Sequence, residues 1–154
     1  NIMPEIDPEA KDAFVDDYLL YLMAQASAAV SAEFHARLAK QGVSVATWRI
    51  LASLYPNKTL NVGELARSCL AKQPTLTRQL DKLCAEGLTE RQNEDRDRRG
   101  VLVRLTAEGQ TAARRHVEAA KRHEAEVFSQ LSPTSVAQLK STLTELIQRT
   151  TSKT

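Results

Sequence analysis

Hydrophobic residues recur every three or four positions through most of this chain, with polar residues between them. This spacing is typical of amphipathic helices, because it places the apolar side chains on one face. Short apolar runs bounded by turn residues are instead typical of strands. The pattern predicts a mainly α protein with about six helices and a small sheet of two or three strands. The expected helices cover about residues 8–41, 44–54, 61–69, 74–86, 107–130 and 133–148.

The segment Leu70–Ala85 has the most informative pattern. Leu76, Leu80 and Leu83 form a narrow apolar stripe at positions i, i+4 and i+7. Pro74 suits the first turn of the same helix, where its missing N–H costs nothing. The opposite side is polar and carries Gln73, Thr75, Thr77, Arg78 and Lys82. Such a helix fits the major groove of DNA, although an ordinary surface helix with a solvated polar face has the same pattern.

A second helix precedes this segment and is separated from it by a short turn. Asn61 is placed as its N-cap, and Glu64 is the residue that returns a hydrogen bond to the cap. The two helices and their turn predict a helix-turn-helix.

A hairpin follows the helix-turn-helix. Gly87 ends the leucine-backed helix, and residues 88–91 and 101–105 then read as two strands joined by a polar turn. Thr59–Leu60 can add a third strand. A hairpin in this position is the wing of a winged helix-turn-helix.

The expected tip of the wing combines arginines with acidic residues. It contains Arg96, Arg98 and Arg99 among Glu94, Asp95 and Asp97. The net charge there is small, so bulk attraction is not the reason to expect DNA binding. The acids are instead placed to orient the arginine side chains toward a narrow minor groove.

Taken together, these motifs resemble the DNA-binding module of the multiple antibiotic resistance regulator (MarR) family of winged-helix transcription factors. The matching residues are Glu64-Leu65-Ala66, Thr75-Leu76-Thr77-Arg78, Leu80, Leu83, Gly87-Leu88, Glu90-Arg91, Asp97-Arg98-Arg99 and Leu105-Thr106-Ala107-Glu108-Gly109. The resemblance extends from about residue 10 to about residue 150. It implies one domain, 1–154, with a winged helix-turn-helix over 44–106 and a helical dimerisation region made of 8–41 and 107–150.

Composition agrees with one soluble domain. The 154 residues are 42% hydrophobic and 26% charged, and the formal net charge of +2 requires any basic surface to be local. No apolar run approaches the ~20 residues of a membrane span, and the N-terminus does not resemble a secretory signal. With only Cys69 and Cys84, a reducing cytoplasm is the expected location.

The terminal helices favour a homodimer. The expected first helix has about 32 residues and a length of roughly 48 Å, whereas a compact monomer of this size is only about 40 Å across. The last helix repeats apolar residues at Val136, Leu139, Leu143, Leu146 and Ile147. In the resembled family the first, fifth and sixth helices interlock between two subunits. A monomer that packs these helices internally is the alternative.

The residues do not form a pattern typical of catalysis, so we expect neither an enzyme nor a cofactor. No phosphate-binding glycine loop or nucleophile elbow is present. His116 and His123 are two turns apart on one helix, too far to chelate one metal unaided. Cys69 and Cys84 are not spaced as a zinc clip and suit small core positions. A metal- or redox-responsive member of the family remains an alternative, although peroxide-sensing relatives carry their cysteine near the start of the first helix, where this chain has none.

The expected function is a DNA-binding transcriptional regulator, a homodimeric repressor of a pseudo-palindromic operator in double-stranded DNA. The residues expected at DNA are Lys72, Gln73, Thr75, Thr77, Arg78, Lys82, Arg96, Asp97, Arg98 and Arg99. Asp97 is expected to brace Arg99, because a carboxylate facing phosphates would be repelled. A winged-helix protein-interaction module without DNA binding is the alternative.

The resemblance also implies a small effector, often an aromatic acid, that releases the DNA. Its candidate binding residues are Ser31, His35, Trp48, Arg49 and His116. Trp48 as a core residue and Arg49 as a surface charge explain those two positions equally well.

Overall fold

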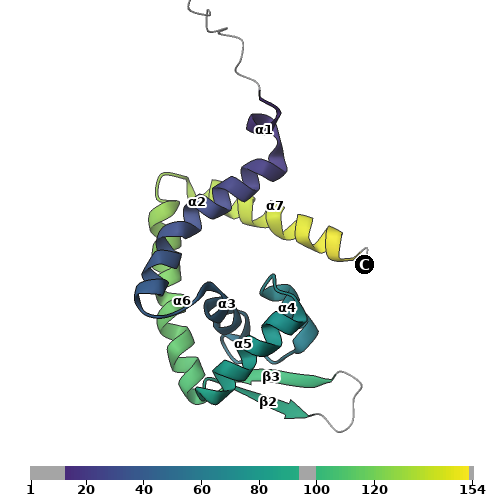
Figure 1. Cartoon of the computed structure of the whole chain (residues 1–154). Helices are drawn as coiled ribbons and strands as arrows, with labels where there is room; N and C mark the ends of the chain where they lie inside the picture. The colour runs from purple at the N-terminus through teal and green to yellow at the C-terminus, as the bar shows by residue number, and fades with distance from the viewer. Residues whose placement is uncertain (1–12, 94–99, 153–154) are drawn as a thin grey trace, which may run out of the picture. The chain divides into compact units, whose positions relative to one another are not determined.

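The computed structural model describes residues 13–93 and 100–152, which form seven helices and one three-stranded sheet (Figure 1). The chain separates into two compact units, residues 1–45 and 46–154, which are taken in turn. The elements are α1 (Phe14–Asp17), α2 (Leu19–Lys40), α3 (Val45–Leu54), β1 (Leu60–Asn61), α4 (Val62–Ser68), α5 (Gln73–Ala85), β2 (Thr89–Asn93), β3 (Val101–Leu105), α6 (Ala107–Val127) and α7 (Pro133–Thr151). None of the helices in these ranges is long and apolar enough to cross a membrane.

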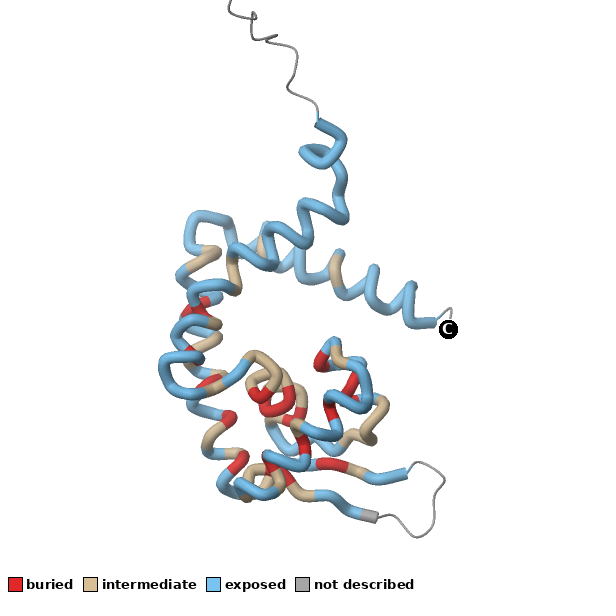
Figure 2. Tube along the Cα trace, viewed as in Figure 1, coloured by how far each residue is buried: buried red, intermediate tan, exposed pale blue. Residues whose placement is uncertain are grey.

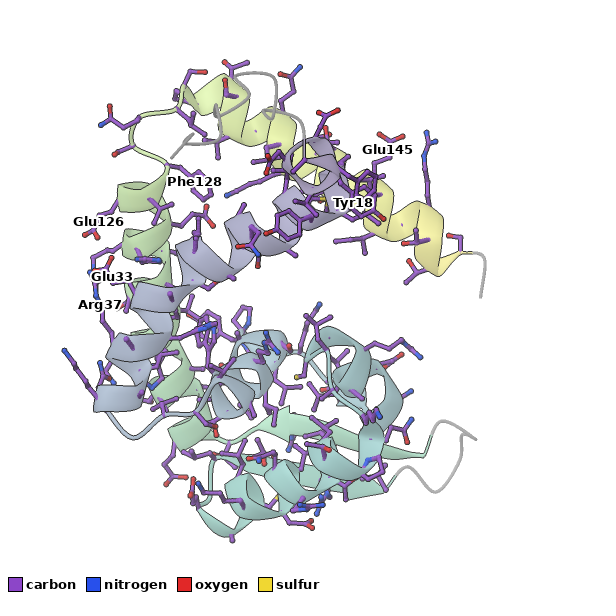
Figure 3. All side chains as sticks on the ribbon, turned by 45° about the horizontal axis from the view of Figure 1, so that its top comes forward. Tyr18, Glu33, Arg37, Glu126, Phe128 and Glu145 are labelled. Carbon is purple, nitrogen blue, oxygen red and sulfur yellow. The ribbon has the colours of Figure 1, made fainter. Side chains whose placement is uncertain are left out.

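The first unit contains two helices where one uninterrupted helix was predicted. The break lies at Tyr18, whose backbone is extended at φ −79° and ψ 109°. Apolar residues continue on both sides of Tyr18, and its ring stacks on Phe14 at 4.8 Å between centroids, so the hydrophobic pattern does not reveal the break. The predicted helix start near residue 8 lies outside the described residues. On α2, Glu33 and Arg37 form an ion pair one turn apart (Figure 3).

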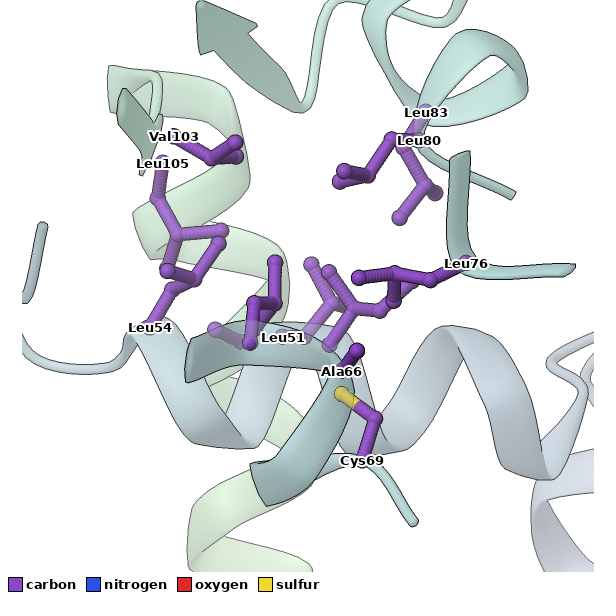
Figure 4. Packing of buried hydrophobic residues seen from close by; sticks show 12 residues of the cluster. Leu51, Leu54, Ala66, Cys69, Leu76, Leu80, Leu83, Val103 and Leu105 are labelled. Atoms are coloured by element: carbon purple, nitrogen blue, oxygen red, sulfur yellow. The ribbon is translucent and has the colours of Figure 1, made fainter. Parts of the chain in front are cut away.

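The second unit is built around one hydrophobic cluster shared by α3, α4, α5, α6 and the sheet (Figure 4). Its largest fully buried side chains come from α3, α4, α5 and β3. They are Ile50, Leu51, Leu54, Leu65, Leu76, Leu80, Leu83 and Val103. The leucine stripe predicted for α5 is therefore confirmed as the buried side of that helix.

The sheet has the order β1-β3-β2 and is antiparallel throughout. The returning strand lies at Val101–Leu105 as predicted, and a third strand is present one residue later than expected, at Leu60–Asn61. Val103 and Leu105 point into the cluster, whereas Arg104, between them, is exposed and pairs with Glu90 of the opposite strand.

The hairpin joins α6 through a close backbone contact. Thr106 caps α6 by accepting a hydrogen bond from the Gly109 N–H at 3.0 Å, and its hydroxyl donates to the Gly87 carbonyl at 2.6 Å. A Cβ atom at Gly109 would lie 1.9 Å from the Leu88 carbonyl oxygen. Only glycine fits this position, so the end of α5, the hairpin and the first turn of α6 are held together by backbone atoms.

The terminal helices contribute little to the buried residues (Figure 2). None of the residues of α1 or α7 is buried, and α2 buries only Phe34 and Leu38. Large apolar side chains that remain exposed include Phe14, Leu19, Leu20, Tyr21, Leu22, Leu139, Leu146 and Ile147.

Candidate nucleic-acid interface

The helix-turn-helix predicted from the sequence is present in the second unit. Asn61 accepts a hydrogen bond from the Glu64 N–H at 2.8 Å, and the Glu64 carboxylate accepts one from the Asn61 N–H at 2.9 Å. This reciprocal pair satisfies two amides at the start of α4. The N-cap and its partner are thus confirmed.

The turn between α4 and α5 is tight and contains an unusual residue. The Ala71 N–H donates to the Ala66 carbonyl at 3.0 Å, and the Leu70 N–H donates to the Arg67 carbonyl at 3.2 Å. This hydrogen-bond pattern requires a left-handed residue just after the helix, a position usually filled by glycine. Here it is Leu70, with φ +54° and 80% of its surface exposed.

The two sides of α5 differ as predicted. Leu76, Leu80 and Leu83 are almost completely buried. The exposed residues of α5 and its N-cap include the six that were predicted there to meet DNA, namely Lys72, Gln73, Thr75, Thr77, Arg78 and Lys82, and we call these six the recognition surface. Lys72, the N-cap, makes no side-chain hydrogen bond to the helix, which leaves amides of the first turn available to an anionic group.

Two members of the recognition surface have defined neighbours within the protein. The Gln73 amide nitrogen lies 3.3 Å from the position that a Cβ atom on Gly63 would occupy, so Gln73 lies against the first turn of α4. The Lys82 ammonium lies 3.9 Å from the Glu86 carboxylate.

The remaining predicted DNA-contacting residues are those expected at the tip of the wing. Arg96, Asp97, Arg98 and Arg99 fall in 94–99, outside the described residues. The predicted contact of Asp97 with Arg99 therefore stays a prediction. The strands on either side of this segment, β2 and β3, are paired, with Gln92 opposite Leu102 and Arg91 opposite Val103.

Sequence reasoning missed an ion pair between α5 and the hairpin. The Arg91 guanidinium lies 2.7 Å from the Asp81 carboxylate. The two residues are ten positions apart in different elements, so neither the helical nor the strand periodicity indicates the contact. The opposite charges of Asp81 and Arg91 were the only available signal.

The effector candidates are divided between the two units. Ser31 and His35 are half-buried residues of α2, in the first unit. In the second unit, Trp48 and Arg49 are half-buried on α3, and His116 is buried on α6. Burial lowers the pKa of His116, with a smaller contribution from the neighbouring Arg115 charge, so its neutral form is favoured.

Arg49 has a contact inside the second unit. Its guanidinium donates to the carbonyl oxygen of Cys69 at 3.5 Å, at the C-terminal end of α4. A cation suits that end of a helix. This contact gives Arg49 a hydrogen-bond partner within the second unit.

The cysteines occupy core-like positions. Burial raises the pKa of the Cys69 thiol, against smaller lowering contributions from Ser53 and Arg49. A raised pKa disfavours the reactive thiolate. Cys84 is half-buried, with its sulfur 3.2 Å from the Thr89 hydroxyl. Among the described residues, no group of three or more His, Cys, Asp or Glu side chains is placed to hold a metal ion.

A groove lies between the C-terminal half of α6 and the start of α7. Its volume is about 590 Å³. Phe128, Leu131 and Val136 give it an apolar centre, and Lys121, Glu124 and Lys140 lie along it. The Lys140–Glu124 ion pair joins the two helices there.

Comparison with known proteins gives one consistent result. The MarR family profile matches residues 43–101. A MarR family transcriptional regulator from Silicibacter pomeroyi DSS-3, SPO1453, is 39% identical, with a TM-score of 0.79 over 89% of this chain and 98% of that protein. NadR, solved in complex with 4-hydroxyphenylacetate, is 28% identical, with a TM-score of 0.77 over 92% of this chain and 97% of NadR.

Curated relatives are also transcriptional regulators. The regulator FarR of Neisseria gonorrhoeae is 34% identical over 86 residues, which cover 56% of this chain and 59% of FarR. The repressor IacR of Pseudomonas putida is 25% identical over 67% of this chain and 62% of IacR. The chain thus spans about three-fifths of the length of these curated relatives. The relatives are regulators rather than enzymes, and this chain, with its winged helix-turn-helix, belongs to the MarR family of transcriptional regulators.

Proposed function

We propose that this protein is a homodimeric repressor that binds a pseudo-palindromic operator and is released from it by a small aromatic acid. The observation that carries DNA binding is the recognition surface. It places amide, hydroxyl and cationic side chains on the exposed side of α5, while three buried leucines fix the other side. A helix held in this way keeps its geometry when it enters a major groove.

Each member of the surface has a role that follows from its chemistry. Gln73, Thr75, Thr77 and Arg78 are suited to base edges and neighbouring phosphates. Lys72 and Lys82 supply charge to phosphates. The hairpin would bring Arg96, Arg98 and Arg99 to the flanking minor groove, with Asp97 bracing Arg99.

The exposed apolar residues of the terminal helices support a homodimer. All eight large apolar side chains between Phe14 and Met23 are exposed in the single chain, namely Phe14, Val15, Tyr18, Leu19, Leu20, Tyr21, Leu22 and Met23. Exposed apolar surface of this extent is typical of an interface. A two-fold dimer would present two copies of α5 about 34 Å apart, one turn of the duplex.

The effector class is proposed from the related protein NadR, which was solved with 4-hydroxyphenylacetate. Ser31, His35, Trp48, Arg49 and His116 remain the candidate binding residues. A ligand that prefers a dimer with a different spacing of the two α5 helices would lower the affinity for DNA by shifting the population.

Selection from a random pool of DNA duplexes tests the proposal on the full chain. We expect recovery of an inverted repeat, with an affinity that falls steeply as salt is raised, because bound phosphates release counterions. Arg78→Ala should weaken binding to the recovered duplex by about 1–3 kcal/mol. Arg122→Ala removes the same charge from an exposed position of α6 and serves as the matched control, once sedimentation has shown that its oligomeric state equals that of the parent.

Two results would contradict the proposal. Recovery of no duplex above background would contradict DNA binding. Equal losses of DNA affinity for both arginine variants would contradict the assigned role of α5. Adding 4-hydroxyphenylacetate and related acids to the complex tests the effector. Unchanged DNA affinity across the series would contradict that part alone.

A further inference from the structure

We propose that Asp81 is a positioning residue for DNA recognition, acting through its ion pair with Arg91 to fix the direction of the hairpin relative to α5. This inference rests on the proposed DNA-binding function. It assigns Asp81 no direct contact with DNA.

The geometry places this ion pair between the two elements proposed to read DNA. Asp81 lies on α5, and Arg91 is the third residue of β2, with 2.7 Å between their charged atoms. Arg91 is opposite Val103, which is fully buried. Because side chains of paired residues share a face of the sheet, the Arg91 side chain starts on the face that covers the core. Only a third of the Arg91 side chain is exposed.

Other contacts between α5 and β2 lie close to their junction. The Leu88 N–H donates to the Leu83 carbonyl at 2.9 Å, and the Cys84 sulfur lies 3.2 Å from the Thr89 hydroxyl. These contacts fix where the strand begins. The Asp81–Arg91 pair lies three residues before Cys84 on α5 and two residues after Thr89 on β2, so it constrains the angle between helix and strand.

Asp81 places a negative charge close to the surface that is proposed to meet DNA. It follows Arg78 by three residues and precedes Lys82, so it lies beside two members of the recognition surface. An unpaired carboxylate there would repel phosphates. Arg91 compensates this charge, and its own guanidinium is already engaged by Asp81. Because the Asp81 side chain is 62% exposed, water screens the pair and its contribution to folding is small, which leaves orientation as its main effect.

The direction in which one substitution changes DNA affinity distinguishes a positioning role from a purely electrostatic effect. Asp81→Asn removes a negative charge beside the DNA and should strengthen binding if only charge matters. If the pair sets the angle of the hairpin, the same variant should weaken binding to the selected duplex by about threefold to tenfold. Asp81→Glu keeps the charge and should restore most of the affinity.

A double-mutant cycle with Arg91→Met completes the test. We expect each single variant to weaken binding and the double variant Asp81→Asn/Arg91→Met to be no weaker than the weaker of the two. The slope of log affinity against log salt should not change for Arg91→Met, whereas a lost phosphate contact would reduce it by about 0.9. Glu90→Gln breaks the Glu90–Arg104 pair of the same hairpin and should not weaken binding.

The possible failures are distinguishable. Equal or tighter binding by Asp81→Asn, additive losses in the cycle, or a reduced salt slope for Arg91→Met would each overturn the positioning role while DNA binding stands. A parent protein that retains no duplex would overturn the proposed function and this inference with it. Thermal unfolding of every variant should match the parent, so that misfolding does not account for a loss.

Discussion

The winged helix-turn-helix and the terminal helices differ in how they cover their apolar residues. The leucines of α5 are buried by α3, α4, α6 and the sheet within one cluster. In contrast, α1 and α7 bury none of their residues. The first region completes its core within one chain, while the second leaves apolar side chains exposed. The same spacing of apolar and polar residues therefore predicts helices in both regions. Only burial shows that the apolar side is covered within the chain in the first region and largely exposed in the second.

The largest expected effect comes from opening the core of the winged region. Leu80→Ala should lower the free energy of unfolding by about 3 kcal/mol, because it removes fully buried methyl groups and leaves a cavity. Chemical denaturation measures this loss. The same change at exposed Leu70 should cost less than about 1 kcal/mol. Similar losses at the two sites would contradict the comparison.

A smaller effect is expected from a charge on the apolar surface of α2. Leu20→Asp, at a side chain that is 61% exposed in the single chain, should raise the dimer dissociation constant at least about tenfold, because the carboxylate would be buried unpaired in the interface. Sedimentation across a concentration series measures this. Lys40→Asp, at the exposed end of the same helix, is the control. Unchanged association of Leu20→Asp would show that this surface is not the dimer interface.

The smallest expected effect is a gain at the turn between α4 and α5. Leu70→Gly should raise the free energy of unfolding by about 0.5–1 kcal/mol, because relief of the left-handed conformation exceeds the added chain entropy of glycine. Thermal unfolding of Leu70→Gly beside Leu70→Ala isolates the backbone contribution, since alanine keeps the strain. A glycine variant no more stable than the alanine variant would show that φ +54° is not strained here.

Local signals predicted much of the second unit. The N-cap at Asn61, the buried side of α5, the strand Val101–Leu105 and the start of α6 at residue 107 were predicted correctly, since each depends on residues a few positions apart. The break at Tyr18 was not predicted, because the residues around it keep a continuous apolar pattern. The expectation of a single helix over 8–41 was wrong at that point.

The candidate site was predictable only in part, for a related reason. The exposed side of α5 follows from helical periodicity, so its residues could be named from the sequence. The contacts of Arg49 with Cys69 and of Asp81 with Arg91 depend on how separate elements pack, and periodicity carries no information about them. The roles of the arginines in 94–99 and of the five effector candidates stay predictions.

The missing side chain at Gly109 determines how movement can pass through the second unit. The Leu88 carbonyl lies where a Cβ atom would be, so the first turn of α6 and the base of the hairpin have no side-chain layer between them to absorb displacement. A small rotation of that turn is therefore expected to move the base of the hairpin and the end of α5 with it. We therefore expect a signal that reaches α6 to reorient the winged helix-turn-helix as a whole.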